Sequence, residues 1–186
     1  SMVTVYYLRR FLDFFQGLLN QIDEEDITIS TEVWWWFEAV EKIVLDRGNN
    51  NHGSFSDKER MLYVSSLGKI FEKYRNKVYL NGFDRTINGS LKKIRKFIIT
   101  IKISLDQTIK MNKSNNMLFE AYNTIKVDVK NQSIDIKKLD LMLEGQVAAL
   151  SSKVLNPDDT VELLDSLFSS ALYRNDMNSF ILYPKK

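Results

Sequence analysis

The chain has 186 residues and a formal net charge of +2, from 26 Lys and Arg against 24 Asp and Glu. Hydrophobic residues make up 44% and charged residues 27%, which is typical of a globular domain and excludes a disordered tail and a membrane protein. The near balance of charge gives no bulk argument for nucleic-acid binding, and the absence of cysteine excludes a disulfide framework and a thiolate metal site.

The first half of the chain shows the apolar spacing of amphipathic helices. Leu8, Phe11, Phe15 and Leu18 recur at alternating intervals of three and four, which predicts a first helix over 3–22. Ser30 or Thr31 can cap a second helix, whose apolar stripe runs from Val33 to Val44.

A third helix is predicted to begin at Ser56-Asp57-Lys58-Glu59, which has the pattern of a capping box, and to run to Val78. A fourth is predicted to start between Asp84 and Ser90 and to reach Leu105, because its apolar residues follow a heptad progression. The β-branched run 97–103 could also form a strand. The longer heptad pattern favours a helix there, and the sequence leaves the strand open as an alternative.

Three more helices are predicted in the second half. The first follows Leu118, Tyr122, Ile125 and Val129, and the second runs from Ile136 to Val154. The third starts at Asn156-Pro157, where a capping side chain precedes a proline, and continues through Leu172. No internal repeat at a fixed period is expected. The sequence therefore predicts an all-α class, an irregular antiparallel helical bundle of about six to seven helices with a short strand-like segment at the C-terminus.

The two ends of the chain predict its domain organisation. Ser1-Met2 has the appearance of a tag scar, so we expect a single helical domain over residues 3–186. The run 179–183 is apolar and strand-like, and Pro184-Lys185-Lys186 follows it directly. Because such a segment needs a partner, we expect the chain to be part of a longer protein.

The sequence contains no recognisable catalytic, cofactor or metal motif. The lone histidine, His52, stands in an Asn-rich loop without a signalled nucleophile or orienting partner. The acidic run 23–26 lacks the alternating spacing and the glycine of a calcium loop. We therefore predict no catalytic residue, no bound cofactor and no metal.

Trp34-Trp35-Trp36 is the most unusual local feature. Successive helical residues point 100° apart, so three tryptophans cover too wide an arc for one buried stripe. Trp36 shares the core face with Val33 and Val40, whereas Trp35 falls on the polar side with Glu38. Trp35 is therefore either covered by a neighbouring helix of its own domain or exposed as a docking residue.

Two further groups are candidates for interaction. Lys92, Lys93, Arg95 and Lys96 lie off the apolar seam of the fourth helix, where they face solvent or grip phosphates. Phe180, Ile181 and Leu182 in the C-terminal run would cover apolar surface by folding back, by pairing with a second copy or by contacting the rest of a longer chain.

These observations predict a non-catalytic helical domain of a larger intracellular, cytoplasmic protein, acting in packing, scaffolding or protein interaction. Its partners would be another protein, the remainder of the chain or a second copy. One alternative is a helical accessory or lid segment of an enzyme. Another is a nucleic-acid-binding module that uses the basic face of the fourth helix.

Overall fold

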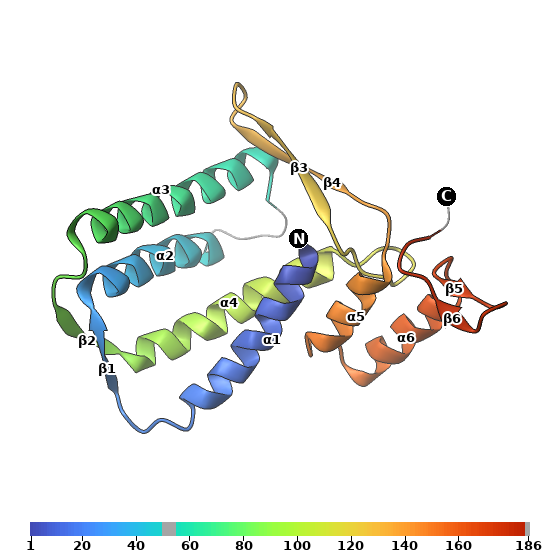
Figure 1. The fold of residues 1–186 in the computed structure, drawn as a ribbon, viewed down its shortest axis with the longest axis horizontal. Helices are drawn as coiled ribbons and strands as arrows, with labels where there is room; N and C mark the ends of the chain where they lie inside the picture. The colour runs from blue at the N-terminus through green and yellow to red at the C-terminus, as the bar shows by residue number, and fades with distance from the viewer. Residues whose placement is uncertain (50–54, 185–186) are drawn as a thin grey trace. The chain divides into compact units, whose positions relative to one another are not determined.

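The computed structural model describes residues 1–49 and 55–184 (Figure 1). Over these residues it contains six helices and three two-stranded sheets. The predicted all-α helical bundle is therefore wrong, and the chain is a mixed α/β protein. His52 lies outside the described residues.

The helices agree with the sequence prediction where a cap or a long apolar repeat marked them. They are α1 (Met2–Leu19), α2 (Thr31–Asn49), α3 (Asp57–Asn81), α4 (Leu91–Met111), α5 (Leu143–Ser151) and α6 (Pro157–Phe168). The predicted capping box is confirmed, since Ser56 and Glu59 exchange side-chain-to-backbone hydrogen bonds at the start of α3. The run 97–103 is helical, within α4.

The strands were largely missed. They are β1 (Asp26–Ser30), β2 (Thr86–Ser90), β3 (Asn123–Asp128), β4 (Ser133–Lys138), β5 (Tyr173–Arg174) and β6 (Ser179–Phe180). The helices predicted over 118–129 and 136–154 are wrong in the parts occupied by β3 and β4. In both strands polar and apolar residues alternate, as in Ser133-Ile134-Asp135-Ile136. The strand-like segment expected at the C-terminus is present as β6.

The described residues pack as two compact units. Unit 1 comprises 1–15, 102–126 and 136–186, and unit 2 comprises 16–101 and 127–135. Each unit combines distant parts of the chain, so packing and not sequence order defines the division. The single domain expected over residues 3–186 stays a prediction.

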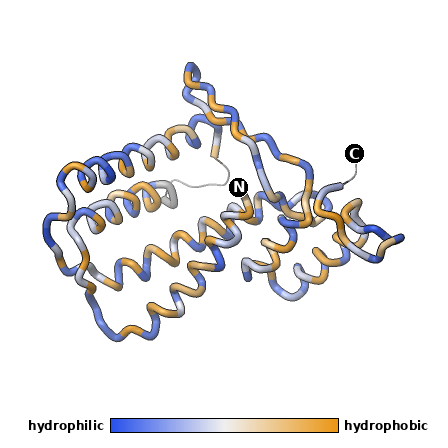
Figure 2. Tube along the Cα trace, in the orientation of Figure 1, coloured by the Kyte–Doolittle hydropathy of each residue, from blue (hydrophilic) through white to orange (hydrophobic). Residues whose placement is uncertain are grey.

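In unit 2, β1 and β2 form an antiparallel ladder, and α2 packs beside α3 (Figure 1). The two helices run in opposite directions, and an aromatic cluster joins them. The Trp36 ring stacks on Tyr74 with 4.9 Å between centroids and lies 5.8 Å from Phe71. Figure 2 shows hydrophilic residues along the middle of α3, and no residue of this helix is fully buried.

The order helix–strand–helix occurs twice, as α1–β1–α2 and α3–β2–α4, and the strands of the two copies begin sixty residues apart. Ile27, Ser30 and Phe37 recur at this spacing as Ile87, Ser90 and Phe97. In the ladder, Thr28 lies opposite Asn88, which is its own equivalent in the other copy. A local two-fold axis therefore passes near this pair, and the expectation of no internal repeat is wrong.

The hydrogen bonds at the two strand-to-helix junctions repeat as well. Ser30 Oγ accepts from the Val33 N–H, and Ser90 Oγ accepts from the Lys93 N–H, each at 3.4 Å. Both serines therefore occupy the capping position of the helix that follows. The Thr31 N–H donates to the Arg85 carbonyl at 2.9 Å, and the Leu91 N–H donates to the Glu25 carbonyl at 2.8 Å. The same pattern of hydrogen bonds therefore occurs at both junctions.

The core of unit 1 forms around Tyr6, Phe119 and Leu163, all of which are fully buried. Gln146, also fully buried, pairs with the Phe119 backbone: its Nε2 donates to the carbonyl and its Oε1 accepts from the N–H, both at 2.8 Å. The Gln146 amide thereby satisfies both backbone polar groups of Phe119. Burial, with the nearby charge of Glu120, raises the pKa of the Tyr6 hydroxyl above its usual value.

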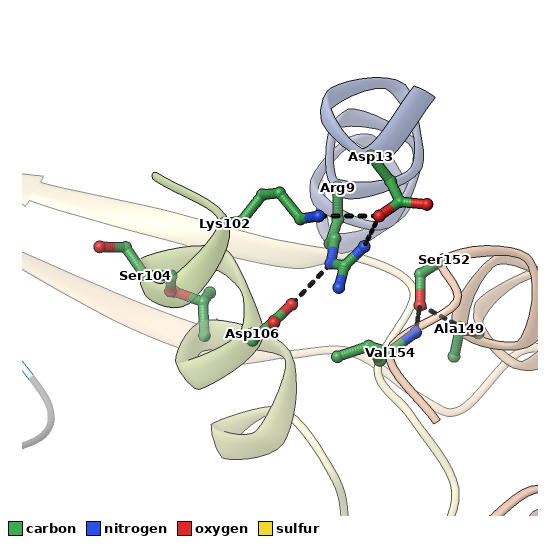
Figure 3. A network of polar contacts seen from close by, with 9 residues as sticks. Arg9, Asp13, Lys102, Ser104, Asp106, Ala149, Ser152 and Val154 are labelled. Carbon is green, nitrogen blue, oxygen red and sulfur yellow. Dashed lines mark hydrogen bonds and ion pairs between the residues drawn. The ribbon is translucent and has the colours of Figure 1, made fainter. Parts of the chain in front are cut away.

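An ion-pair network joins the parts of α1 and α4 that belong to unit 1 (Figure 3). Arg9 Nε lies 2.8 Å from Asp106 Oδ1, and Lys102 Nζ lies 2.7 Å from Asp13 Oδ1. Arg9 also contacts Asp13 at 3.3 Å. A hydrogen bond from Lys102 lowers the pKa of the Asp13 carboxyl against the opposing effect of burial, and the charges of Lys102, Arg9 and Lys153 lower it further.

Candidate binding site

A cavity of about 360 Å³ opens in unit 2 beside the start of α2. Three segments of the chain line it, namely the first turn of α2, the second half of α3 and the residues that lead into β2. The lining residues are Thr31, Glu32, Trp35, Lys73, Tyr74, Lys77, Asp84 and Arg85. Its volume falls within the range of small-molecule sites in proteins.

The β1–β2 ladder brings these segments together. Each strand leads directly into a helix, so the antiparallel pairing places residues 84–85 against the first turn of α2. The Arg85 carbonyl accepts from the Thr31 N–H at 2.9 Å and from the Thr31 hydroxyl at 3.2 Å. The backbone on this side of the cavity is therefore held in place without using the Arg85 side chain.

The three consecutive tryptophans have three different environments. Trp36 packs between α2 and α3, and Trp34 lies against Gly89 of β2 and the Phe37 ring. Trp35 is 37% exposed and lines the cavity. It is the sequence-predicted interaction residue that the structure places in this site.

Cationic side chains line the cavity together with Trp35, alongside the carboxylates of Glu32 and Asp84. Lys73 Nζ lies 4.9 Å from the centre of the indole ring, a cation–π contact. Lys77 and Arg85 lie on the same lining, and all three cationic residues are exposed. The cavity wall therefore combines an aromatic face with side chains that attract an anion.

Glu32 is the buried charge of the site, with a side chain only 3% exposed. Its Oε1 accepts from the Asp84 N–H at 3.4 Å and lies 3.9 Å from Lys77 Nζ. Its Oε2 has no hydrogen-bond partner within 1–49 and 55–184. Burial opposes ionisation, but hydrogen bonds from backbone N–H groups, with the charge of Lys77, keep the pKa of Glu32 below its usual value.

The basic residues predicted on α4 are not a free cationic face. Lys93 Nζ lies 2.7 Å from Glu38 Oε1 and 3.1 Å from Glu41 Oε2, and the hydrogen bond that Lys93 donates to Glu38 is the main cause of its raised pKa. Arg95 Nη2 donates to the Leu19 carbonyl at 2.9 Å and to the Ile22 carbonyl at 2.6 Å. Lys92 and Lys96 are the exposed members of the group.

The C-terminal candidates belong to unit 1, where the run folds back on its own unit. The Phe180 ring lies 5.0 Å from Phe168 and 5.1 Å from Tyr173. The Ile181 N–H donates to the Leu172 carbonyl at 2.8 Å, and the Leu182 carbonyl accepts from the Leu143 N–H at 3.1 Å. The Leu182 side chain remains 48% exposed.

Sequence reasoning missed most of the cavity lining. A signal existed for Lys73 and Lys77, because lysines recur four residues apart on α3 and therefore share one helix face. Glu32 and Arg85 carry no local signal, since their positions depend on a strand pairing between distant segments.

The lining of the cavity contains two aromatic rings, three cationic side chains and two carboxylates. In the described part of the chain, no three His, Asp or Glu side chains come together as a metal site would need. No helix among those residues has the length and apolarity to cross a bilayer. No protein-family model matches the chain, and no curated protein matches it in sequence.

Proposed function

We propose that this chain is a non-catalytic recognition domain, and that the cavity beside the start of α2 binds a planar, negatively charged group of its ligand or protein partner. The observation that carries the proposal is the position of Trp35, exposed on the cavity wall with Lys73 on its ring and with Lys77 and Arg85 on the same lining. Exposed tryptophan is common where proteins bind partners and uncommon elsewhere.

The packing of the site supports this function. Tyr74 stacks on the half-buried Trp36, so one wall of the cavity is fixed to the aromatic contact between α2 and α3. A fixed wall lowers the entropy lost on binding, because fewer side chains have to be ordered. We also propose that the chain is part of a larger protein in the cytoplasm. The absence of cysteine supports the cytoplasmic location.

The test is binding of small aromatic anions to the full chain, followed by two-dimensional NMR of the indole N–H groups. The probe is 1-naphthyl phosphate. Two further, partial probes carry only one part of it each: 1-naphthol has the ring and inorganic phosphate has the charge. The expected result is a selective shift of the Trp35 indole signal with 1-naphthyl phosphate and a weaker response to either partial probe, because both the ring and the charge contribute.

Two variants locate the response. Lys73→Ala with Lys77→Ala should abolish most of the shift, whereas Lys92→Ala with Lys96→Ala, which removes the same charge from exposed positions of α4, should leave it unchanged. No shift at millimolar probe, or an equal loss in both double variants, would overturn the proposal.

A further inference from the structure

We propose, on the basis of that function, that the planar anion is a nucleotide, with its base against Trp35 and its phosphate among Lys73, Lys77 and Arg85. Base stacking on an exposed aromatic ring, beside cationic side chains that hold phosphate, is how proteins bind single nucleotides and unpaired strands. The cavity offers both parts of this arrangement on one lining.

The internal repeat shows that these residues are not required by the fold. In the other copy, Arg95 stands at the position equivalent to Trp35, and Glu25 at the position equivalent to Arg85. The backbone hydrogen bonds of the two junctions are nevertheless the same. The fold is therefore built equally well with an arginine and an acid at these positions, and the aromatic ring and positive charge are available for binding.

The side chain of Arg95, the equivalent of Trp35, makes hydrogen bonds within the protein, whereas the Trp35 side chain makes none among the described residues. The Arg95 guanidinium crosses to the end of α1 and donates to two backbone carbonyls there. Trp35 instead leaves 37% of its surface uncovered beside the cavity. At this one position, therefore, one copy binds its own backbone and the other faces the cavity.

Glu32 needs a hydrogen-bond donor, which a nucleobase can supply. It is buried in the lining, and its Oε2 lacks a hydrogen-bond donor among the described residues. The amino and ring N–H groups of a base are donors that a carboxylate accepts. A simple aromatic anion, such as a naphthyl phosphate, has no such donor, so a nucleotide should bind more tightly than it does.

Binding is measured by titrating the full chain with AMP, GMP, the corresponding nucleosides, 1-naphthyl phosphate and a six-nucleotide single-stranded RNA. We expect the nucleotides to bind about tenfold more tightly than 1-naphthyl phosphate or the nucleosides. Tighter binding of the RNA than of the mononucleotides would identify a single strand as the source of the nucleotide, and equal binding would identify the free nucleotide.

Variants then assign the contacts. Trp35→Ala should weaken nucleotide binding about tenfold or more, in line with other stacked bases. For the RNA, Lys77→Ala and Arg85→Ala should each reduce the salt dependence by about one phosphate contact. Lys92→Ala with Lys96→Ala is the matched control and should change neither.

The failures are distinguishable. If 1-naphthyl phosphate shifts the Trp35 indole but the nucleotides bind no better, the nucleotide inference is wrong and the proposed function stands. If the RNA binds, is insensitive to Trp35→Ala and is lost in the Lys92 and Lys96 variant, binding belongs to α4 and the inference is wrong. If no probe binds, both fail.

Discussion

The rings of Phe37 and Phe97 meet edge to face, with 5.2 Å between their centroids. These phenylalanines are equivalent residues of the two helix–strand–helix copies, on α2 and α4. Equivalent residues touch only where they lie close to the axis that relates the copies. This contact therefore marks the axis in the helical layer, as the Thr28–Asn88 pair does in the strand ladder.

Gly89 and Trp34 both differ from their equivalents in the other copy, and the small residue makes room for the large one. A Cβ at this position would lie 2.6 Å from Cε3 of Trp34, so the large ring fits only because glycine faces it. In the other copy the equivalents of Gly89 and Trp34 are Ile29 and Ile94. Gly89→Ala should therefore cost about 1–3 kcal/mol by overpacking, measured by denaturant unfolding.

A second substitution, at Trp34, tests the contact with Gly89 and is taken from the equivalent position of the other copy. Trp34→Ile, which copies the other half, should recover much of the stability lost in Gly89→Ala, giving a clear coupling energy in the double-mutant cycle. Asn88→Ala, on the same strand but exposed, is the control. Simple additivity of the Gly89 and Trp34 effects would contradict the contact.

Arg95 should stabilise the end of α1. The last carbonyls of a helix have no partner within it, and the Arg95 guanidinium donates to the carbonyl of Leu19, the last residue of α1, and to that of Ile22 just beyond it. Arg95→Ala is expected to cost about 2 kcal/mol, as for other hydrogen bonds to charged groups. Amide exchange at Asn20 and Gln21 should accelerate. Arg95→Lys should restore only part of the loss, because an ammonium lacks the planar fork; full restoration would contradict this geometry.

Trp35 and Trp36 should differ sharply in their effect on stability. Trp36→Ala removes the ring that stacks on Tyr74 and should cost about 3 kcal/mol or more. Trp35→Ala should cost clearly less than Trp36→Ala, because 37% of the Trp35 surface is already exposed. Guanidinium unfolding of both variants measures the difference, and a large loss for Trp35→Ala would mean that the residue serves packing.

Asp13 should give the protein a pH-dependent stability. Its folded pKa is lowered, so its contribution is present above the unfolded pKa and is lost as the pH falls through the folded pKa. Asp13→Asn should lower stability at pH 7 by on the order of 1 kcal/mol, since the side chain is 33% exposed and solvent screens it. The difference in melting temperature between the variant and the wild type should shrink below about pH 4. A difference that is constant from pH 3 to 7 would rule out this linkage.

The C-terminal run should contribute to the stability of unit 1. Phe180→Ala removes ring contacts with Phe168 and Tyr173 and should cost about 2 kcal/mol. Tyr183→Ala, whose side chain is 56% exposed, is the control and should be nearly neutral. Thermal unfolding measures both, and equal melting temperatures for the two variants would show that the run does not stabilise the fold.

The sequence predicted the elements whose signals are local. Ser56 and Glu59 lie within one turn, as do Asn156 and Asp159, so the caps of α3 and α6 are recognisable from the sequence alone. The heptad pattern of α4 likewise outweighed the strand-like run 97–103. These signals depend on neighbours along the chain and not on the fold.

The remaining elements depended on contacts that no local pattern reveals. Leu118, Tyr122, Ile125 and Val129 fit a helical spacing by coincidence, which hid the alternation of β3. The five-residue strand β1 has its partner sixty residues away, so nothing nearby in the sequence indicates the pair. The cavity could not be predicted from the sequence for the same reason, because three distant segments meet there only after the strands have paired.

The ladder of β1 and β2 has a consequence for how the halves of this protein stay together. Each strand has its hydrogen-bonding partner in the other copy, and the Phe37–Phe97 contact also crosses between the copies. The halves therefore meet as two subunits of a dimer would. Two separate fragments, each carrying one copy, should therefore still assemble through these contacts and through the ion pairs between α1 and α4.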